Sequence, residues 1–374
     1  MSNSAIVAID PKNKTALKRF ISLERELMKD NLYYISELDG DVSKFLSGKS
    51  LLAQNMEFGL FIATKSGKDI GRCAAIINKT YQQQKQPGSG FIGFFASADG
   101  YENEVKQLIA KAESWLKERL VSKVIAPVNG GAPNAMGFLV TAFDEDPMFP
   151  FPWTAPHYPA HFEKLNYQPT YPLWYYNVDF NGEKYKKAKA KYSNYTEATI
   201  RPISKKNWDK DIETITDILN ETFVHEWEFT KMSHGAMKEF FAPMKDALAA
   251  EQILIAEANG KPVGFCLAVP DLTPLFRSFN GKIGLKALFK LITGATKKFQ
   301  RAGILGIGVS DEFKGKGLAK AIAMKTYTYH ESLGLKSSLY FPVNEGNSKS
   351  RGFAESIGGT GRLMYQVFDK DISQ

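Results

Sequence analysis

A glycine-rich loop in the last third of the chain has the residue types that point most directly to chemistry. It reads Lys314-Gly315-Lys316-Gly317-Leu318-Ala319, and it lies between an apolar segment, 301–309, and a segment with helical character that extends to about Leu333. Glycine has no Cβ, so the backbone can approach a ligand closely. The N–H groups at the start of a helix bind anions, and the two lysines add positive charge. The loop therefore predicts a polyphosphate site.

The loop resembles the Gln/Arg-x-x-Gly-x-Gly/Ala motif of the GNAT family of acetyltransferases, with lysine at the first position. A second match lies downstream, where Asn347-Ser348-Lys349-Ser350 and then the segment 353–358 are similar to the family's closing Asn-x-x-Ser/Ala helix. The resemblance covers about 199–368. It implies an acyltransferase that moves an acyl group, most simply acetyl, from acyl-coenzyme A to an amine by direct attack.

The resemblance also implies a binding mode for acetyl-coenzyme A or another acyl-coenzyme A. Backbone groups of Ile307 and Val309 would pair with the amides of the pantetheine arm, and Asn347 would contact that arm or its helix. The pyrophosphate would be bound by Lys314, Gly315, Lys316, Gly317, Leu318 and Ala319. The expected acceptor is the amine of a small molecule or a peptide.

Acyl transfer to an amine needs a group that accepts the amine proton and a group that protonates the departing thiolate. Many GNAT proteins place a tyrosine near the thiol, but the aligned residue here is Ala354, so Tyr340 on the preceding strand becomes the candidate acid. The strand 303–309 has no carboxylate. Asp271 and Glu226, the latter beside a histidine, are therefore the candidate bases, although each has the alternative of an ordinary surface or capping residue.

The elements that must position these groups indicate an α/β fold with two GNAT-like domains, each a mostly antiparallel mixed sheet flanked by helices. We expect one domain at 1–182, a Lys-rich solvated linker at 183–197 and a coenzyme A-binding domain at 198–374. In the second domain the patterns predict strands at 199–203, 252–258, 262–269, 301–309, 337–343 and 361–368, with helices at 207–224, 237–249, 318–333 and 348–356. In the first they predict strands at 5–9, 60–63, 72–78, 90–97, 123–128 and 173–180, with helices at 13–28, 101–120 and 161–165.

The first domain looks like a degenerate copy. At the turn that corresponds to the glycine loop it reads Ser97-Ala98-Asp99-Gly100-Tyr101-Glu102-Asn103-Glu104, where the acidic residues would repel a pyrophosphate. We therefore predict no coenzyme A site in this copy. The proline- and aromatic-rich stretch 127–159 is either a long loop packed on its own domain or part of the wall of an acceptor cleft.

Composition bears on whether the protein binds nucleic acid or metal, is secreted, or spans a membrane. The formal net charge is +8, part of which comes from a lysine cluster at 184–191, and no nucleic-acid or metal-binding spacing accompanies it. The two cysteines, Cys73 and Cys266, lie in apolar runs, which is typical of a reducing, cytoplasmic compartment. No apolar stretch is long enough to span a bilayer. The sequence is compatible with a homodimer.

Two other hypotheses remain. Because Ala354 replaces the usual acid, the chain could be an inactive coenzyme A-binding or peptide-binding module. The basic, apolar run 283–299 would also suit a transferase that works at a membrane surface, through Lys286, Lys290, Lys297 and Lys298, although an amphipathic helix packed on the protein has the same pattern.

Overall fold

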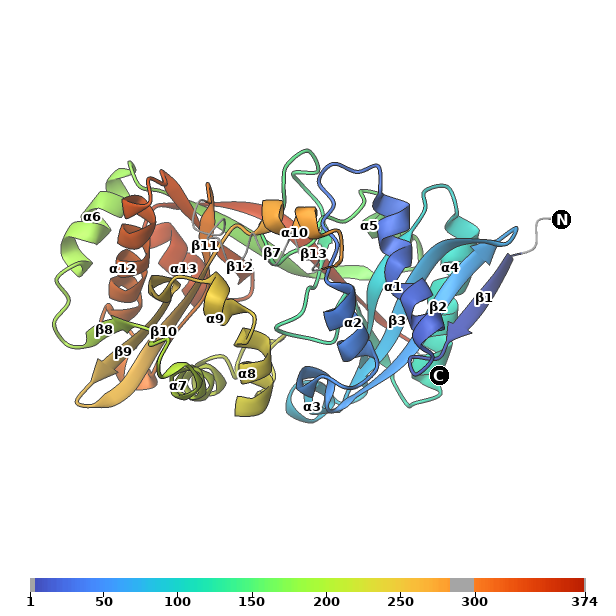
Figure 1. Cartoon of the computed structure of the whole chain (residues 1–374), viewed down its shortest axis with the longest axis horizontal. Helices are drawn as coiled ribbons and strands as arrows, with labels where there is room; N and C mark the ends of the chain where they lie inside the picture. The colour runs from blue at the N-terminus through green and yellow to red at the C-terminus, as the bar shows by residue number, and fades with distance from the viewer. Residues whose placement is uncertain (1–3, 283–298, 373–374) are drawn as a thin grey trace.

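The described residues, 4–282 and 299–372 of a computed structural model, form one continuous sheet of thirteen strands with helices on both faces (Figure 1). The strand order is β1-β2-β3-β4-β5-β13-β7-β12-β11-β10-β9-β8, and β6 pairs with β13 at the side of this path. The α/β prediction with two similar halves is confirmed. None of the described helices combines the length and apolar character that a membrane crossing requires.

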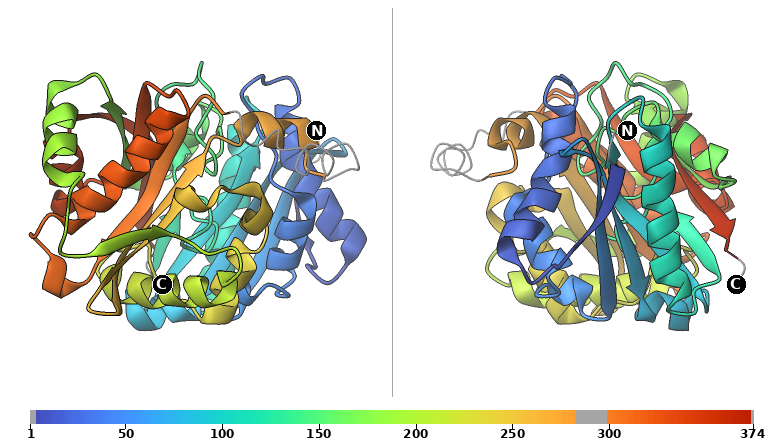
Figure 2. Two further views of the ribbon diagram at one scale, coloured as in Figure 1. Left: turned by 60° about the vertical axis from the view of Figure 1, so that its left-hand side comes forward. Right: turned by 90° about the vertical axis from the view of Figure 1, so that its right-hand side faces the viewer.

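The first half runs from β1 to β7. Its elements are β1 (Ser4–Ile9), α1 (Lys14–Met28), α2 (Asp39–Leu46), β2 (Met56–Lys65), β3 (Lys68–Asn78), α3 (Lys79–Gln84), β4 (Ser89–Ser97), α4 (Glu102–Lys117), β5 (Lys123–Ala126), β6 (Phe138–Leu139), α5 (Tyr158–Lys164) and β7 (Gln168–Asp179). Helices α1 and α4 lie on opposite faces of this part of the sheet, as the right-hand view of Figure 2 shows. Both are amphipathic, and their apolar faces join the large core cluster of this half.

The second half runs from α6 to β13. Its elements are α6 (Glu183–Tyr192), β8 (Thr199–Pro202), α7 (Trp208–Thr222), α8 (His234–Phe241), α9 (Met244–Ala247), β9 (Ile253–Ala258), β10 (Lys261–Pro270), α10 (Thr273–Phe279), β11 (Ala302–Val309), α12 (Leu318–Ser332), β12 (Ser337–Asn344), α13 (Ser348–Ser356) and β13 (Gly359–Asp371). The single helix predicted at 237–249 is divided, because Pro243 separates α8 from α9 and has no N–H to continue the helical hydrogen bonds. The lysines of the run 283–298 lie outside the described residues.

Both predicted hairpins form, and the reason is local. The turn between β9 and β10 places Asn259 and Gly260 at φ values of 51° and 72°, and the turn between β2 and β3 places Ser66 and Gly67 at 50° and 78°. A type I′ turn, the two-residue turn whose twist matches that of paired strands, requires positive φ at both of its central residues. The hairpins align β3 and β10 for the strands that follow.

The last strand of each half is exchanged with the other half. Strand β7, from the first half, pairs with β12 of the second, and β13, from the second half, pairs with β5 of the first. The two exchanged strands also pair with each other, from Gly359 opposite Val178 to Asp369 opposite Gln168. They cross the middle of the molecule in Figure 1. The sequence suggested that each domain closes with its own strand, and the structure corrects this.

The segment expected to be a solvated linker is helix α6, and it packs on α12. Tyr185 is 1% exposed, Ala188 is buried, and Lys189 forms an ion pair with Glu331 of α12. Tyr185 and Ala188 lie three residues apart, so they share one helix face, and most lysines occupy the opposite face. The segment still connects the two halves, but the prediction that it is solvated was wrong. The many lysines made the sequence look fully polar, although Tyr185 and Ala188 form a narrow apolar face.

The proline- and aromatic-rich stretch 127–159 is packed rather than open. Trp153 is 5% exposed and donates its indole N–H to the Phe143 carbonyl oxygen at 3.0 Å. The Pro147 carbonyl accepts from the Thr273 hydroxyl of the second half at 3.0 Å. The stretch therefore fastens the first half to the second.

Candidate active site

Strands β11 and β12 begin side by side and then separate. Their parallel pairing joins Gly303 with Leu339 and Ile304 with Tyr340. On the other side of β11, the register with β10 shifts between Leu267 and Ala268, so that β11 carries one additional residue at this point, a β-bulge. The bulge bends β11 away from β12. Beyond it, the β12-facing backbone groups of β11 are available to a ligand that enters the wedge.

The glycine loop lies at the end of β11, directly before α12. Gly315 and Gly317 have φ values of +78° and +88°, a left-handed conformation that glycine adopts without steric cost. The first N–H groups of α12 have no partner within the helix, and the helix dipole favours negative charge there. A Cβ at position 315 would meet no atom within 4 Å, whereas one at 317 would lie 2.6 Å from Cε1 of Tyr192. The loop fits a polyphosphate on the open side of Gly315.

A cavity of about 1150 Å³ joins the wedge and the loop. Most of the predicted site residues line it together: Glu226, Ile307, Val309, Lys314, Gly315, Ala319, Tyr340 and Asn347. Lys316, Gly317 and Leu318 are absent from this lining, and Leu318 is fully buried. The contact predicted for Gly317 and Leu318 is through backbone N–H groups. The cavity therefore brings six of the nine predicted donor-binding residues and two of the three predicted catalytic residues to one place.

Tyr340, the predicted acid, lies in the wall of the cavity. It is 8% exposed, lines the cavity and donates its hydroxyl to Oγ of Ser350 at 3.1 Å. Burial raises the pKa of Tyr340 to about 12, so the hydroxyl keeps its proton at neutral pH. Ala354, where the family usually has tyrosine, is fully buried in the core of the second half and has no group to donate. Tyr340 thus has the chemistry that position 354 lacks.

The structure does not bring Asp271 to the cavity. Its Oδ2 accepts from Arg301 at 2.8 Å and 2.6 Å, and its Oδ1 accepts from the Thr273 N–H at 3.0 Å. The side chain is 7% exposed. Asp271 precedes helix α10 by two residues and binds the N–H of its first residue and Arg301, and these contacts are structural.

Comparisons with known proteins fit this geometry. Residues 212–358 match the model of the acetyltransferase (GNAT) family. The chain is 25% identical to a protein of Caulobacter vibrioides described as a bacterial ceramide synthase, over 99% of each chain. It is 24% identical to protein YghO of Escherichia coli, over 96% of this chain and 94% of that one. A tandem GNAT protein from the clavulanic acid biosynthesis pathway superposes with a TM-score of 0.59 at 9% identity, over 100% of this chain and 99% of its own.

The match to the GNAT family model lies within the second half, and the whole chain has the tandem GNAT fold. The first GNAT-like half has the same wedge, between β4 and β5, but its own residues close it. Phe94 N–H donates to Oδ1 of Asn129 at 2.7 Å, and Val128 N–H donates to the Ile92 carbonyl at 3.0 Å. A Cβ at Gly93 would lie 2.3 Å from the Val128 oxygen, so glycine is required for this approach.

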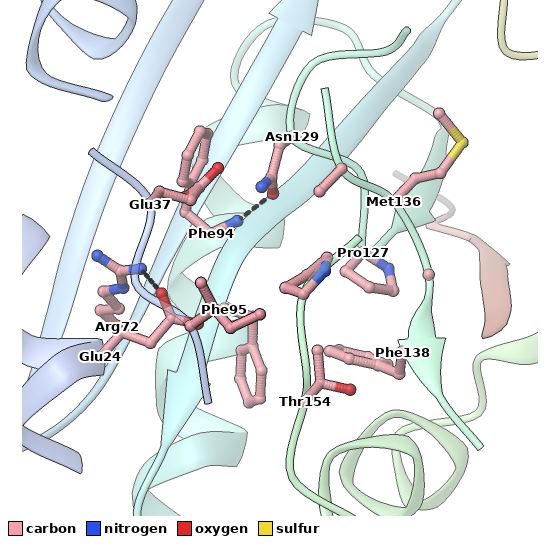
Figure 3. A pocket seen from close by; sticks show the side chains of 14 residues that line it. Glu24, Glu37, Arg72, Phe94, Phe95, Pro127, Asn129, Met136, Phe138 and Thr154 are labelled. Carbon is pink, nitrogen blue, oxygen red and sulfur yellow. Dashed lines mark hydrogen bonds and ion pairs between the residues drawn. The ribbon is translucent and has the colours of Figure 1, made fainter. Parts of the chain in front are cut away.

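The pocket that remains in the first wedge is small, and a few polar side chains lie among its mostly apolar lining (Figure 3). It holds about 40 Å³, room for about three water molecules. Arg72, 2% exposed, forms an ion pair with Glu24 at 2.5 Å on one side, and Asn129 reaches Phe94 on the other. In the acidic turn at 97–104, the Glu104 carboxylate is already bound, since it accepts from the Ser4 hydroxyl and pairs with Lys65. These contacts support the prediction that this copy does not bind coenzyme A.

Three cavity residues were not singled out from the sequence. Trp227 and Glu228 follow Glu226 directly, and Tyr171 lies on the exchanged strand β7. The Trp227 and Tyr171 rings are stacked, with centroids 4.1 Å apart and planes at 15°. The sequence Glu226-Trp227-Glu228 was the available signal for two of them. Tyr171 could not be assigned to the second half's site without knowledge of the strand exchange.

Proposed function

We propose that the protein is an N-acyltransferase that moves an acyl group from acyl-coenzyme A to a primary amine by direct attack. The observation that carries this proposal is the cavity in the β11–β12 wedge, which the glycine loop and the segment 225–228 both line. At about 1150 Å³ it exceeds the range of about 300–1,000 Å³ usual for sites of drug-sized ligands. Donor and acceptor therefore have room in one complex.

The second half has the groups to hold the donor. The backbone of Ile307 and Val309 faces the open part of the wedge, and the N–H groups of residues 315–319 would hold the pyrophosphate, with Lys314 beside them. Asn347 is fixed as the N-cap of α13, because its Oδ1 accepts from the Ser350 N–H at 2.9 Å. Acyl-coenzyme A would supply the thioester. Tyr340 would donate a proton to the departing sulfur.

The acceptor we propose is a long-chain amino alcohol, and the donor a fatty acyl-coenzyme A rather than acetyl-coenzyme A. A ceramide is the amide of such an amine with a fatty acid, and the relative from Caulobacter vibrioides that bears this name aligns over 99% of the chain. The flat apolar stack of Tyr171 and Trp227 in the cavity supports an acceptor with an apolar part.

The test is thiol release by the full-length protein from palmitoyl- and acetyl-coenzyme A, each offered with sphinganine and with ethanolamine. The expected result is release with palmitoyl-coenzyme A and sphinganine, with formation of the amide confirmed by mass spectrometry. Release with acetyl-coenzyme A and ethanolamine alone would retain the N-acyltransferase and reject the long-chain substrates. Coenzyme A binding without release in any combination would reject the enzyme and favour an inactive binding module.

A further inference from the structure

The segment between α7 and α8, residues 223–233, belongs to the second half but is held by the first. Lys85, which follows α3, donates its ammonium group to the Val224 carbonyl at 2.5 Å and to the Glu226 carbonyl at 2.6 Å. The N–H of Ala132 donates to the Glu228 carbonyl at 3.3 Å. The first half thus fixes the backbone of a segment whose side chains line the second half's cavity.

The two carboxylates of this segment have different surroundings. Glu226 Oε1 accepts from Nδ2 of Asn347 at 2.5 Å, which ties the segment to the N-cap of α13. Glu228 also lines the cavity, but among the described residues its carboxylate has no side-chain hydrogen-bond partner, and its Oε2 is buried. A buried carboxylate oxygen without a partner is costly, so it is a strong acceptor for a substrate cation. Glu226 connects two segments of the second half, whereas the Glu228 carboxylate binds a backbone N–H and leaves its Oε2 without a partner among the described residues.

The neighbours of Glu228 suit an amine that carries an apolar chain. Trp227, the adjacent residue, stacks on Tyr171, and both rings line the same cavity. An ammonium group at the Glu228 carboxylate would place its carbon chain near these flat apolar faces. The arrangement offers one charged and one apolar contact, the combination that orients an amphiphilic ligand.

We propose that Glu228 is the base that takes the proton from the acceptor's ammonium group, and that Lys85 of the first half positions it. This rests on the proposed N-acyltransferase function. One proton passes from nitrogen to Glu228, and the free amine forms the C–N bond as the thioester C–S bond breaks. Tyr340 donates its proton to the departing sulfur, and the second proton lost from the nitrogen reprotonates Tyr340 through solvent. After product release Glu228 gives its proton to solvent, so one amide, one thiol and one proton result.

The surroundings of Glu228 bring its pKa close to neutral pH, where a general base is most effective. Facing it are Glu226 and His225 on its own segment, and Tyr81 and Lys85 on the first half. Burial, with a smaller contribution from the negative charge of Glu226, raises the pKa of Glu228 to about 7, while the backbone N–H of Glu228 and, to a smaller extent, Lys85 lower it. The base form therefore prevails above pH 7. Activity should rise with pH through a pKa near 7.

The experiment compares two isosteric variants of the full-length protein, Glu228→Gln and Glu226→Gln, by kcat/KM against pH and by the Kd for coenzyme A. For Glu228→Gln we expect kcat/KM to fall by about 10²- to 10⁴-fold, as for loss of a general base, with the rise near pH 7 lost and the coenzyme A Kd within about twofold of wild type. Glu226→Gln should weaken coenzyme A binding and keep the rise near pH 7. Glu228→Asp should keep that rise at a reduced kcat.

Lys85 is tested by Lys85→Met and Lys85→Arg. Lys85→Met should lower kcat/KM and move the rise to higher pH, because a positive charge near Glu228 is removed, and arginine should restore part of the activity. A Glu228→Gln variant with wild-type kcat/KM and pH profile would overturn the proposal while the N-acyltransferase function stands. No turnover by the wild-type protein with any amine would overturn both.

Discussion

The most direct test of the donor site is a negative charge at Gly315. The Cβ of residue 315 would point into open space beside the cavity, so Gly315→Asp adds a carboxylate next to the expected pyrophosphate without a steric clash. Asparagine has the same shape without the charge, and both residues tolerate the left-handed conformation at φ +78°. Gly315→Asn is therefore the matched control.

The size of the effect follows from the charge. A carboxylate about 5 Å from one phosphate charge costs about 1–3 kcal/mol when the effective dielectric constant is between about 80 and 20. This corresponds to a loss of about 5- to 150-fold in coenzyme A affinity. The loss should shrink as salt is added, because the site is open to solvent.

The assay is isothermal titration with coenzyme A at two salt concentrations, with thermal unfolding of each variant as a check on the fold. Equal affinities for Gly315→Asp and Gly315→Asn would refute the placement of the pyrophosphate on this loop. Gly317→Asp is a less clean test, because its Cβ would lie 2.6 Å from Tyr192 of α6. We expect that variant to lower the unfolding temperature as well as the affinity.

Three further predictions concern residues outside the cavity. Asp271→Asn should lower the free energy of unfolding by about 1–3 kcal/mol, because Arg301 loses its partner, while the pH profile of kcat/KM keeps its shape; a lost acidic limb would restore Asp271 as a base. Leu120 is 76% exposed and has a φ of 63° after α4, so Leu120→Gly should raise the free energy of unfolding by about 0.5–1 kcal/mol in urea titrations. Burial lowers the pKa of His330 to about 4 from 6.5, and the unfolded chain therefore binds a proton first as the pH falls. The stabilising effect of the neutral ring should be complete above pH 6.5 and should fall by about 3 kcal/mol towards pH 4; equal slopes for wild type and His330→Gln would refute this.

The parts of the fold that the sequence predicted well are those whose cause is local. The Asn259-Gly260 turn and the glycine loop follow from backbone conformations that few residues adopt, so a short sequence is enough to identify them. The amphipathic helices α1 and α4 follow from apolar spacing alone. The glycine loop predicted in this way lines the cavity at Lys314, Gly315 and Ala319.

The parts that the sequence did not predict depend on contacts between distant segments. The pattern of β7 and β13 shows that each is a strand, but pairing partners are set by the whole sheet, so the exchange left no local signal. The same holds for Tyr171, which reaches the cavity only through that exchange. Asp271 was a reasonable base until its partner Arg301, thirty positions away, was known. Only the tertiary contacts show which of several plausible carboxylates is already bound to another side chain.

The exchange of β7 and β13 also has a consequence for synthesis of the protein. Strand β5 receives its neighbour from Gly359–Asp371, which the ribosome makes after all the other described strands. At about 5–20 residues per second, the roughly 230 residues between β5 and β13 take about 12–46 s to appear. During that time the edge of β5 is unpaired and open to association with other chains. A chain cut short before β13 would leave the first half without the strand that pairs with β5, although that half is made first.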